Sequence, residues 1–307
     1  MEYTHLGRTK ERIPLIGLGT WKIPNDDPGA AKVLAYGISR GMSLIDTAEM
    51  YANEELVGRA IRIAKGNGDN VFVATKALPK NFRHEDLIRA CEGSLKRLGV
   101  KEIDLYQLHW PNHAVPISET MHAMEELVDK GKIRYIGVSN FDVKEMQAAQ
   151  SAMKRYEIVS NQVEYSVAVR EIERGLLKAC RESGVTIIAY SPLARGAINY
   201  NKQLYLKLNE FAEKYGKSPS QIALNYVISH KGVIAIPKAS SKEHMDQNAG
   251  AVGWRLSKQD IAILSNSKGL RSRPLAGKAL SYILKRTSSW SRLMALHEKN
   301  RHVAKKE

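Results

Sequence analysis

Short runs of apolar residues alternate along most of this chain with longer segments in which apolar residues recur every three or four positions. The short runs predict buried strands, and the longer segments predict amphipathic helices. The predicted strands are residues 15–19, 44–46, 71–75, 103–108, 135–138, 158–163, 185–189 and 233–236. The predicted helices are residues 28–40, 54–64, 84–98, 117–130, 143–153, 172–183, 204–230 and 242–249. Each strand is thus followed by a helix.

This alternation indicates a sheet of parallel strands, because each crossover between parallel strands needs a connecting helix. Eight is the number of strands that closes a (β/α)8 TIM barrel. An open doubly wound sheet would usually carry a glycine-rich phosphate loop after its first strand, but Gly17-Leu18-Gly19 is followed by Thr20 and Trp21. We therefore predict a TIM barrel, preceded by a β-hairpin formed by residues 2–6 and 13–19.

The composition favours a soluble protein of a reducing compartment. The two cysteines of the 307-residue chain, Cys91 and Cys180, lie far apart and show no spacing typical of a metal site. No apolar run reaches the roughly 20 residues that a membrane span needs. The first residues, 1–6, are polar and of mixed charge, unlike a signal peptide. We expect a cytoplasmic protein with no membrane span.

Positive charge is concentrated towards the carboxyl terminus. The net charge is +15, and residues 271–307 contain ten Lys and Arg but only two Glu. We predict a barrel domain over residues 1–270 and a basic segment over residues 271–307, with one or two short amphipathic helices packed on the barrel. Closure over the substrate, an oligomer contact and adhesion to anionic membrane are the other interpretations of this segment. No nucleic-acid-reading motif accompanies the charge, so we predict no nucleic-acid partner.

Four titratable residues of different kinds lie at or shortly after the ends of consecutive predicted strands: Asp46, Tyr51, Lys76 and His109. In a TIM barrel these ends meet at one mouth, where active sites lie. Together the four side chains suit proton donation to a reacting oxygen. An ammonium beside a phenol lowers the pKa of the phenol, an acid can hold the ammonium, and an imidazole can orient a carbonyl. The strand ends lack a cluster of metal ligands, so we predict no metal.

Five further motifs stand out along the chain: GMSLIDTAEMYANEELVG at 41–58, VSNF at 138–141, NQVEY at 161–165, YSPL at 190–193 and IPKAS at 236–240. With these motifs the chain resembles the aldo-keto reductase family, with short loops, over nearly its whole length. The resemblance implies an NADPH-dependent enzyme that reduces aldehydes or ketones to alcohols by direct hydride transfer. It further implies a catalytic tetrad of Asp46, Tyr51, Lys76 and His109, in which Tyr51 is the general acid. A reductase-like regulatory subunit that binds NADPH and turns over slowly is the alternative.

The resemblance also implies the residues that hold the cofactor. They are Thr20, Trp21, Asp46, Ser139, Asn140, Gln162, Tyr190, Ser191, Pro192, Leu193, Ile236, Lys238, Ala239, Ser240, Ser241, His244, Gln247 and Asn248. Ser139, Asn140 and Gln162 would hold the nicotinamide carboxamide, and Tyr190 would stack on the ring. Ser191 and Leu193 would contact the pyrophosphate region.

Lys238 and Ser240 would meet the 2′-phosphate of the adenosine. His244 stands where many family members have an arginine for the same phosphate. Because neutral histidine is a poorer phosphate ligand than arginine, NADH is possible as a secondary cofactor.

Large side chains beside the tetrad predict the substrate pocket. Trp21, Met50 and Trp110 are expected to line it together with Tyr51 and His109. Apolar walls around a few polar groups suit a small carbonyl compound of partly apolar character. The loop that follows His109 is short, which predicts an open pocket. For the assembly we expect a monomer or a weak homo-oligomer.

Overall fold

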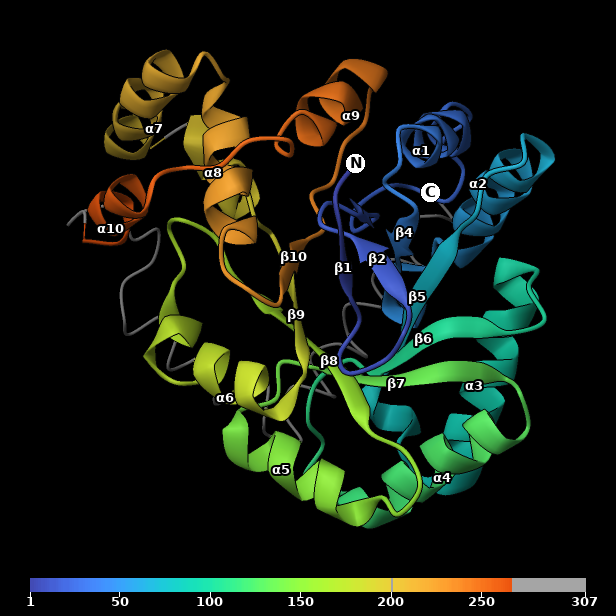
Figure 1. The fold of residues 1–307 in the computed structure, drawn as a ribbon. Helices are drawn as coiled ribbons and strands as arrows, with labels where there is room; N and C mark the ends of the chain where they lie inside the picture. The colour runs from blue at the N-terminus through green and yellow to red at the C-terminus, as the bar shows by residue number, and fades with distance from the viewer. Residues whose placement is uncertain (200, 267–307) are drawn as a thin grey trace, which may run out of the picture.

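A computed structural model of the protein describes residues 1–199 and 201–266 (Figure 1). Its strands are β1 Tyr3–His5, β2 Arg12–Pro14, β3 Leu18–Gly19, β4 Leu44–Asp46, β5 Phe72–Ala77, β6 Ile103–Leu108, β7 Ile133–Ser139, β8 Ile158–Glu164, β9 Thr186–Tyr190 and β10 Val233–Ala235. Its α-helices are α1 Ala30–Ser39, α2 Glu54–Gly66, α3 His84–Leu98, α4 Ile117–Asp129, α5 Val143–Ala152, α6 Leu176–Ser183, α7 Lys202–Tyr215, α8 Pro219–Ile228, α9 Lys242–Ala249 and α10 Lys258–Asn266. All eight predicted barrel strands are present.

The strands β3 to β10 pair in parallel in chain order. The sheet also closes on itself, because the segment that leads into β3 bonds to the segment around β10. The amide of Ala235 donates to the carbonyl of Leu15 at 2.9 Å, and the amide of Gly17 donates to the carbonyl of Ala235 at 2.8 Å. A third bond, at 3.1 Å, runs from Gly19 to the carbonyl of Pro237. The predicted TIM-barrel fold is confirmed.

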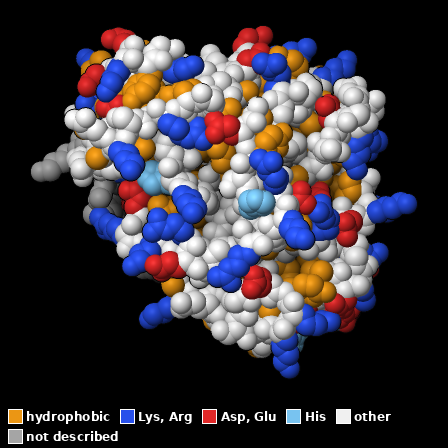
Figure 2. Space-filling view, in the orientation of Figure 1, with side chains coloured by type: hydrophobic (Ala, Val, Ile, Leu, Met, Phe, Trp, Pro, Cys, Tyr) orange, Lys and Arg blue, Asp and Glu red, His pale blue; other side chains and the backbone are white. Residues whose placement is uncertain are grey.

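The amino-terminal hairpin lies across one end of this barrel (Figure 1). Leu6 and Ile13 of the hairpin are completely buried, and the amide of Gly7 donates to the Thr186 hydroxyl at the start of β9 at 2.8 Å. The hairpin therefore covers the amino ends of the strands and leaves the carboxyl ends accessible. Seen from the hairpin side, Lys and Arg side chains are spread among acidic ones and do not form a single patch (Figure 2).

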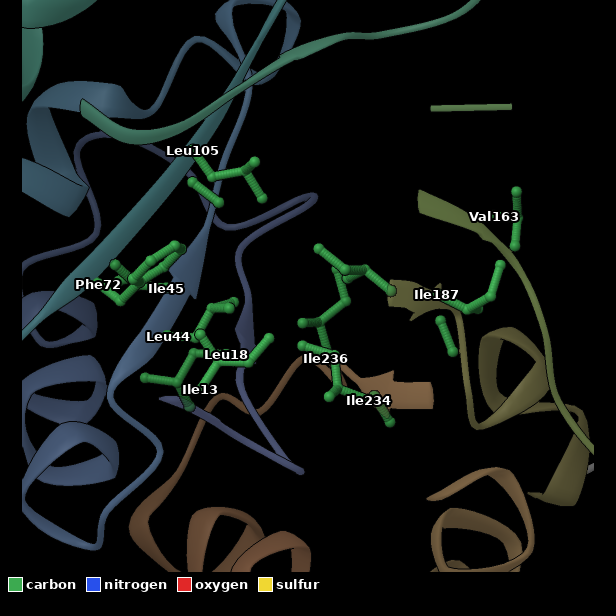
Figure 3. Close-up of a cluster of buried hydrophobic side chains, with 14 of the residues drawn as sticks. Ile13, Leu18, Leu44, Ile45, Phe72, Leu105, Val163, Ile187, Ile234 and Ile236 are labelled. Atoms are coloured by element: carbon green, nitrogen blue, oxygen red, sulfur yellow. The ribbon is translucent and has the colours of Figure 1, made fainter. Parts of the chain in front are cut away.

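The core is built from the apolar runs that predicted the strands. Buried side chains from β3, β4, β5, β6, β8, β9 and β10 belong to one cluster, among them Leu18, Ile45 and Ile187 (Figure 3). Strands of a parallel sheet that is covered by helices are apolar on both faces, so they appear in the sequence as short unbroken hydrophobic runs.

The predicted helical region over residues 204–230 contains two helices, α7 and α8. Gly216 ends α7 with φ of 62°, a left-handed conformation that glycine adopts without a steric penalty. Ser218 then caps α8 by accepting a hydrogen bond from the amide of Gln221, and Pro219 occupies the first helical position.

The predicted helix over residues 172–183 is also divided. A single 3-10 turn, η3 Glu171–Arg174, precedes Gly175, and α6 begins after it.

The helix α10 was not predicted. The predicted basic helical extension, residues 271–307, lies outside the described residues. None of the helices in the described part of the chain combines the length and the apolar character that crossing a membrane needs.

Candidate active site

The barrel places the four predicted titratable residues at its carboxyl end. Asp46 is the last residue of β4, Lys76 lies next to the last residue of β5, and His109 directly follows β6. Tyr51 is the last residue of a 3-10 turn, η1 Glu49–Tyr51, between β4 and α2. Because β4, β5 and β6 are parallel neighbours, residues at their carboxyl ends meet at one edge.

Asp46 and Lys76 form a buried ion pair. The Lys76 ammonium donates to both carboxylate oxygens of Asp46 at 2.8 Å and to the carbonyl of Thr47 at 2.7 Å, so its three donors are all used. The side chain of Lys76 is fully buried. Burial lowers the pKa of Lys76 and raises the pKa of Asp46, while their mutual attraction opposes both changes.

Tyr51 lies beside this pair without sharing its hydrogen bonds. The Lys76 nitrogen is 5.1 Å from the centre of the Tyr51 ring, and the His109 ring stands edge-on to it at 5.7 Å. Burial raises the pKa of Tyr51 well above its usual value, and the charge of Asp46 adds to this. The sequence predicted a lowered pKa, whereas burial and the negative charge of Asp46 raise the pKa of Tyr51. Tyr51 therefore keeps its proton at neutral pH.

The residues that the family resemblance assigned to the nicotinamide lie next to the same ion pair. Gln162, in β8, donates from its side chain to Asp46 at 2.7 Å. The backbone carbonyl of Gln162 accepts from the Ser139 hydroxyl at 2.8 Å and from the backbone amide of Asn140 at 2.9 Å. Asn140 adopts φ of 61°, a left-handed conformation that asparagine tolerates better than most residues.

Asn140 connects this group to His109 and Tyr190. Its side-chain amide donates to the carbonyl of His109 at 3.0 Å, and its side-chain oxygen accepts from the Tyr190 hydroxyl at 2.9 Å. The ring of Tyr190 remains half-buried. The side chains of Ser139, Asn140 and Gln162 are thus bonded to one another, to Asp46 and to Tyr190.

The residues expected at the phosphate end lie in the loop after β10 and in α9, which contains His244, Gln247 and Asn248. Lys238, Ser240 and His244 are exposed, as anion-binding side chains must be. The Ser241 hydroxyl caps α9 by accepting from the amide of His244 at 3.3 Å. Gln247 is exposed, whereas the last predicted residue of this group, Asn248, is buried.

Several other predicted cofactor residues have little exposed surface. They are Thr20, Pro192, Ile236 and Ala239. The Thr20 hydroxyl donates to the carbonyl of Asp46 at 2.9 Å, so this side chain already has a partner within the protein. Ser191 and Leu193 are half-buried.

The residues predicted to line the substrate pocket differ in exposure, and Trp21 is the most exposed of them. The indole of Trp21 is 39% exposed and has cations near it, with the Lys22 nitrogen at 4.7 Å and the Arg195 guanidinium carbon at 5.6 Å from the ring centre. Trp110 is nearly buried and packs on the His109 ring at 4.4 Å. Met50 is half-buried beside Tyr51.

Sequence reasoning missed several polar residues that support this mouth. Glu49 accepts from the amide of Leu78 at 3.0 Å and from the Asn81 side chain at 2.8 Å, which ties η1 to the loop after β5. Arg195 pairs with Glu164 at 3.3 Å. No local periodicity marks such contacts, because each joins loops far apart in sequence. Among the described residues no three His, Cys, Asp or Glu side chains gather as a metal site would require.

Known sequences similar to this chain include two reductases that are named for small carbonyl compounds. The sequence model of the Aldo/keto reductase family matches residues 15–268. The methylglyoxal reductase YeaE of Escherichia coli is 39% identical, over 83% of this chain and 91% of that protein. The glyoxal reductase of Bacillus subtilis is 35% identical, over 81% of this chain and 87% of that protein.

Solved structures agree with the sequence matches. The thermostable aldo-keto reductase Tm1743, in complex with the inhibitor epalrestat, superposes with a TM-score of 0.80 at 40% identity, covering 86% of this chain and 99% of that chain. An aldo/keto reductase from Klebsiella pneumoniae, in complex with NADP and acetate, gives a TM-score of 0.76 at 39% identity, covering 86% of this chain and 93% of that chain.

Proposed function

The chain belongs to the aldo/keto reductase family, and on that premise we propose that it reduces a small aldehyde or ketone to an alcohol with NADPH. The observation that carries this proposal is the protonated Tyr51 beside the buried pair of Lys76 and Asp46, with His109 next to it. A phenol that keeps its proton and is only partly buried is equipped to give that proton to a developing alkoxide.

Each member of the proposed tetrad has one task. Tyr51 donates its hydroxyl proton to the carbonyl oxygen, and His109 orients that oxygen by hydrogen bonding. Lys76 stabilises the tyrosinate that remains, because an ammonium favours a nearby anion. Asp46 keeps Lys76 charged in a buried position, where an unpaired ammonium would lose its proton.

NADPH, when bound, supplies the hydride that adds to the carbonyl carbon. Ser139, Asn140 and Gln162 would hold its carboxamide, and the half-buried ring of Tyr190 would meet its nicotinamide face. Lys238 would bind the 2′-phosphate, together with Ser240, through charge-assisted hydrogen bonds. The Klebsiella pneumoniae relatives bound to NADP and to NADPH support this choice of cofactor.

His244→Arg is expected to raise the preference for NADPH over NADH. An arginine at this exposed position would add charge-assisted, two-pronged hydrogen bonds to the 2′-phosphate. We expect the ratio of kcat/KM for NADPH to that for NADH to rise about 10-fold, which corresponds to about 1.4 kcal/mol. His244→Gln, which stays neutral, should leave the ratio unchanged. An unchanged ratio in the arginine variant would show that position 244 does not face the phosphate.

The reductase function is tested by following NADPH and NADH absorbance with a panel of methylglyoxal, glyoxal, simple aldehydes, aldoses and ketones. The glyoxal and methylglyoxal reductases among the relatives favour short dicarbonyls as the substrate class, so those should be reduced fastest. Tight NADPH binding with no reduction of any compound in the panel would instead support the alternative, a regulatory subunit of low turnover.

We also propose that residues 1–270 act as one barrel domain and that residues 271–307 pack against it. The two buried cysteines, Cys91 and Cys180, remain free thiols in the structure, which suits the reducing cytoplasm as the site of action. A monomer or a weak homo-oligomer is expected, and sedimentation analysis at several protein concentrations tests this.

A further inference from the structure

Asn53 is a fully buried amide that lies between the turn with Tyr51 and the start of α2. Its side-chain nitrogen donates to two backbone carbonyls, those of Thr20 at 2.9 Å and Ile23 at 3.0 Å. Its side-chain oxygen accepts from the Thr47 hydroxyl at 2.8 Å. Asn53 therefore joins the loop after β3 to the loop after β4.

Both loops reach the ion pair of the proposed tetrad. The carbonyl of Thr47 is the third acceptor of the Lys76 ammonium, at 2.7 Å. The carbonyl of Asp46 is held by Thr20, through its amide at 3.1 Å and its hydroxyl at 2.9 Å. Asn53 binds both Thr20 and Thr47, and Thr20 binds the carbonyl of Asp46. These hydrogen bonds together enclose the backbone at Asp46.

The loop after β3 also presents Trp21 to the mouth of the barrel. Trp21 lies between Thr20 and Ile23, the two residues whose carbonyls Asn53 binds. A second tie, from the amide of Leu56 to the Asn25 side chain at 2.9 Å, holds the same loop to α2. The side-chain amide of Asn53 thus fixes the position of both the Trp21 indole and the Thr47 carbonyl that binds Lys76.

We propose that Asn53 is a positioning residue that couples the Trp21 loop to the proton-donating group of Tyr51, Lys76 and Asp46. The proposal rests on the proposed reductase function and extends it to a residue that touches neither substrate nor cofactor. Without Asn53, the carbonyl of Ile23 and the Thr47 hydroxyl lose their partner, and the carbonyl of Thr20 keeps only the bond from the amide of Ile23. Each buried polar group without a partner is costly. The loops then move apart to reach water, and the Thr47 carbonyl moves with them.

Asn53→Ala is expected to lower kcat by about 10²-fold, the loss typical of a displacement of about 1 Å at reacting groups. KM for the carbonyl substrate should change much less. The Thr47 carbonyl favours the charged form of Lys76, so loosening it lowers the pKa of Lys76. The rate should therefore begin to fall at lower pH on the alkaline side of the profile.

Thr47→Val, which removes a single hydrogen bond and preserves shape, should shift the profile in the same direction by less.

The chain offers a matched control in Asn225. This amide is also fully buried, donates to two backbone carbonyls, of Ala251 and Trp254, and accepts from the amide of Leu256. It lies in α8, in the outer layer of helices. Asn225→Ala should lose stability as Asn53→Ala does, yet keep the wild-type pH profile and kcat.

Amide hydrogen exchange provides a readout that needs no turnover. Asn53→Ala should speed exchange in residues 18–26 and 44–52 together, whereas Asn225→Ala should leave both segments unchanged. If the wild type reduces no carbonyl, the reductase function fails, and the exchange result still decides whether Asn53 couples the two loops. Unchanged exchange in either segment of Asn53→Ala, or equal changes of the pH profile in the Asn53 and Asn225 variants, would overturn the proposal.

Discussion

Tyr51→Phe is expected to lower kcat for carbonyl reduction by about 10²- to 10⁴-fold, the usual contribution of a general acid. The change removes only the hydroxyl that carries the proton. The ring keeps its edge-on contact with His109, and the buried ion pair keeps all of its hydrogen bonds. The Kd for NADPH should therefore be unchanged, because the hydroxyl contributes to chemistry and not to cofactor binding.

Steady-state kinetics and a fluorescence titration with NADPH, made on the same preparation, separate these two effects. Tyr156→Phe is the control, since the Tyr156 hydroxyl donates to Asp129 at 2.8 Å on the outside of the barrel. It should keep the wild-type kcat. Wild-type turnover in Tyr51→Phe would exclude Tyr51 as the acid, and a large loss of NADPH affinity would mean that its hydroxyl serves binding.

Lys76→Met is expected to remove activity and to lower the free energy of unfolding by about 3–5 kcal/mol. This is the usual cost of leaving a buried charge, here Asp46, without its ion-pair partner. Asp46 would keep the Gln162 donor but lose the ammonium that neutralises it. Its carboxyl would then take up a proton more readily, because burial already raises its pKa. Tyr51 would lose the cation that stabilises its anion, so kcat should fall as well.

Denaturant titrations with equal m-values measure the stability loss. Adding Asp46→Asn to Lys76→Met removes the stranded charge, and this double variant should regain part of the lost stability without regaining activity. Lys130→Met is the control on the surface, where the exposed pair with Glu126 contributes little. A double variant less stable than Lys76→Met, or a Lys76→Met protein as stable as the wild type, would contradict the role given to the pair.

The local pattern of the sequence was enough to predict most of the fold. The helices α3 and α9 have the predicted limits, because their apolar spacing and their ends are local properties of the chain. The rule that parallel strands present their carboxyl ends at one edge was enough to bring Asp46 and Lys76 together. The apolar spacing did not reveal the break at Gly216. There the glycine ends α7, and Ser218 and Pro219 begin α8.

The sequence by itself thus determined the barrel and the residue types at its mouth, since both follow from periodicity and from order along the chain. The tertiary structure alone decided which groups neutralise one another and which lose contact with water. It paired Gln162 with Asp46, 116 positions apart, and placed the half-buried Tyr51 where desolvation raises its pKa. Hydrogen bonds and desolvation depend on distances of a few ångströms between remote segments, and those distances exist only once the barrel has closed.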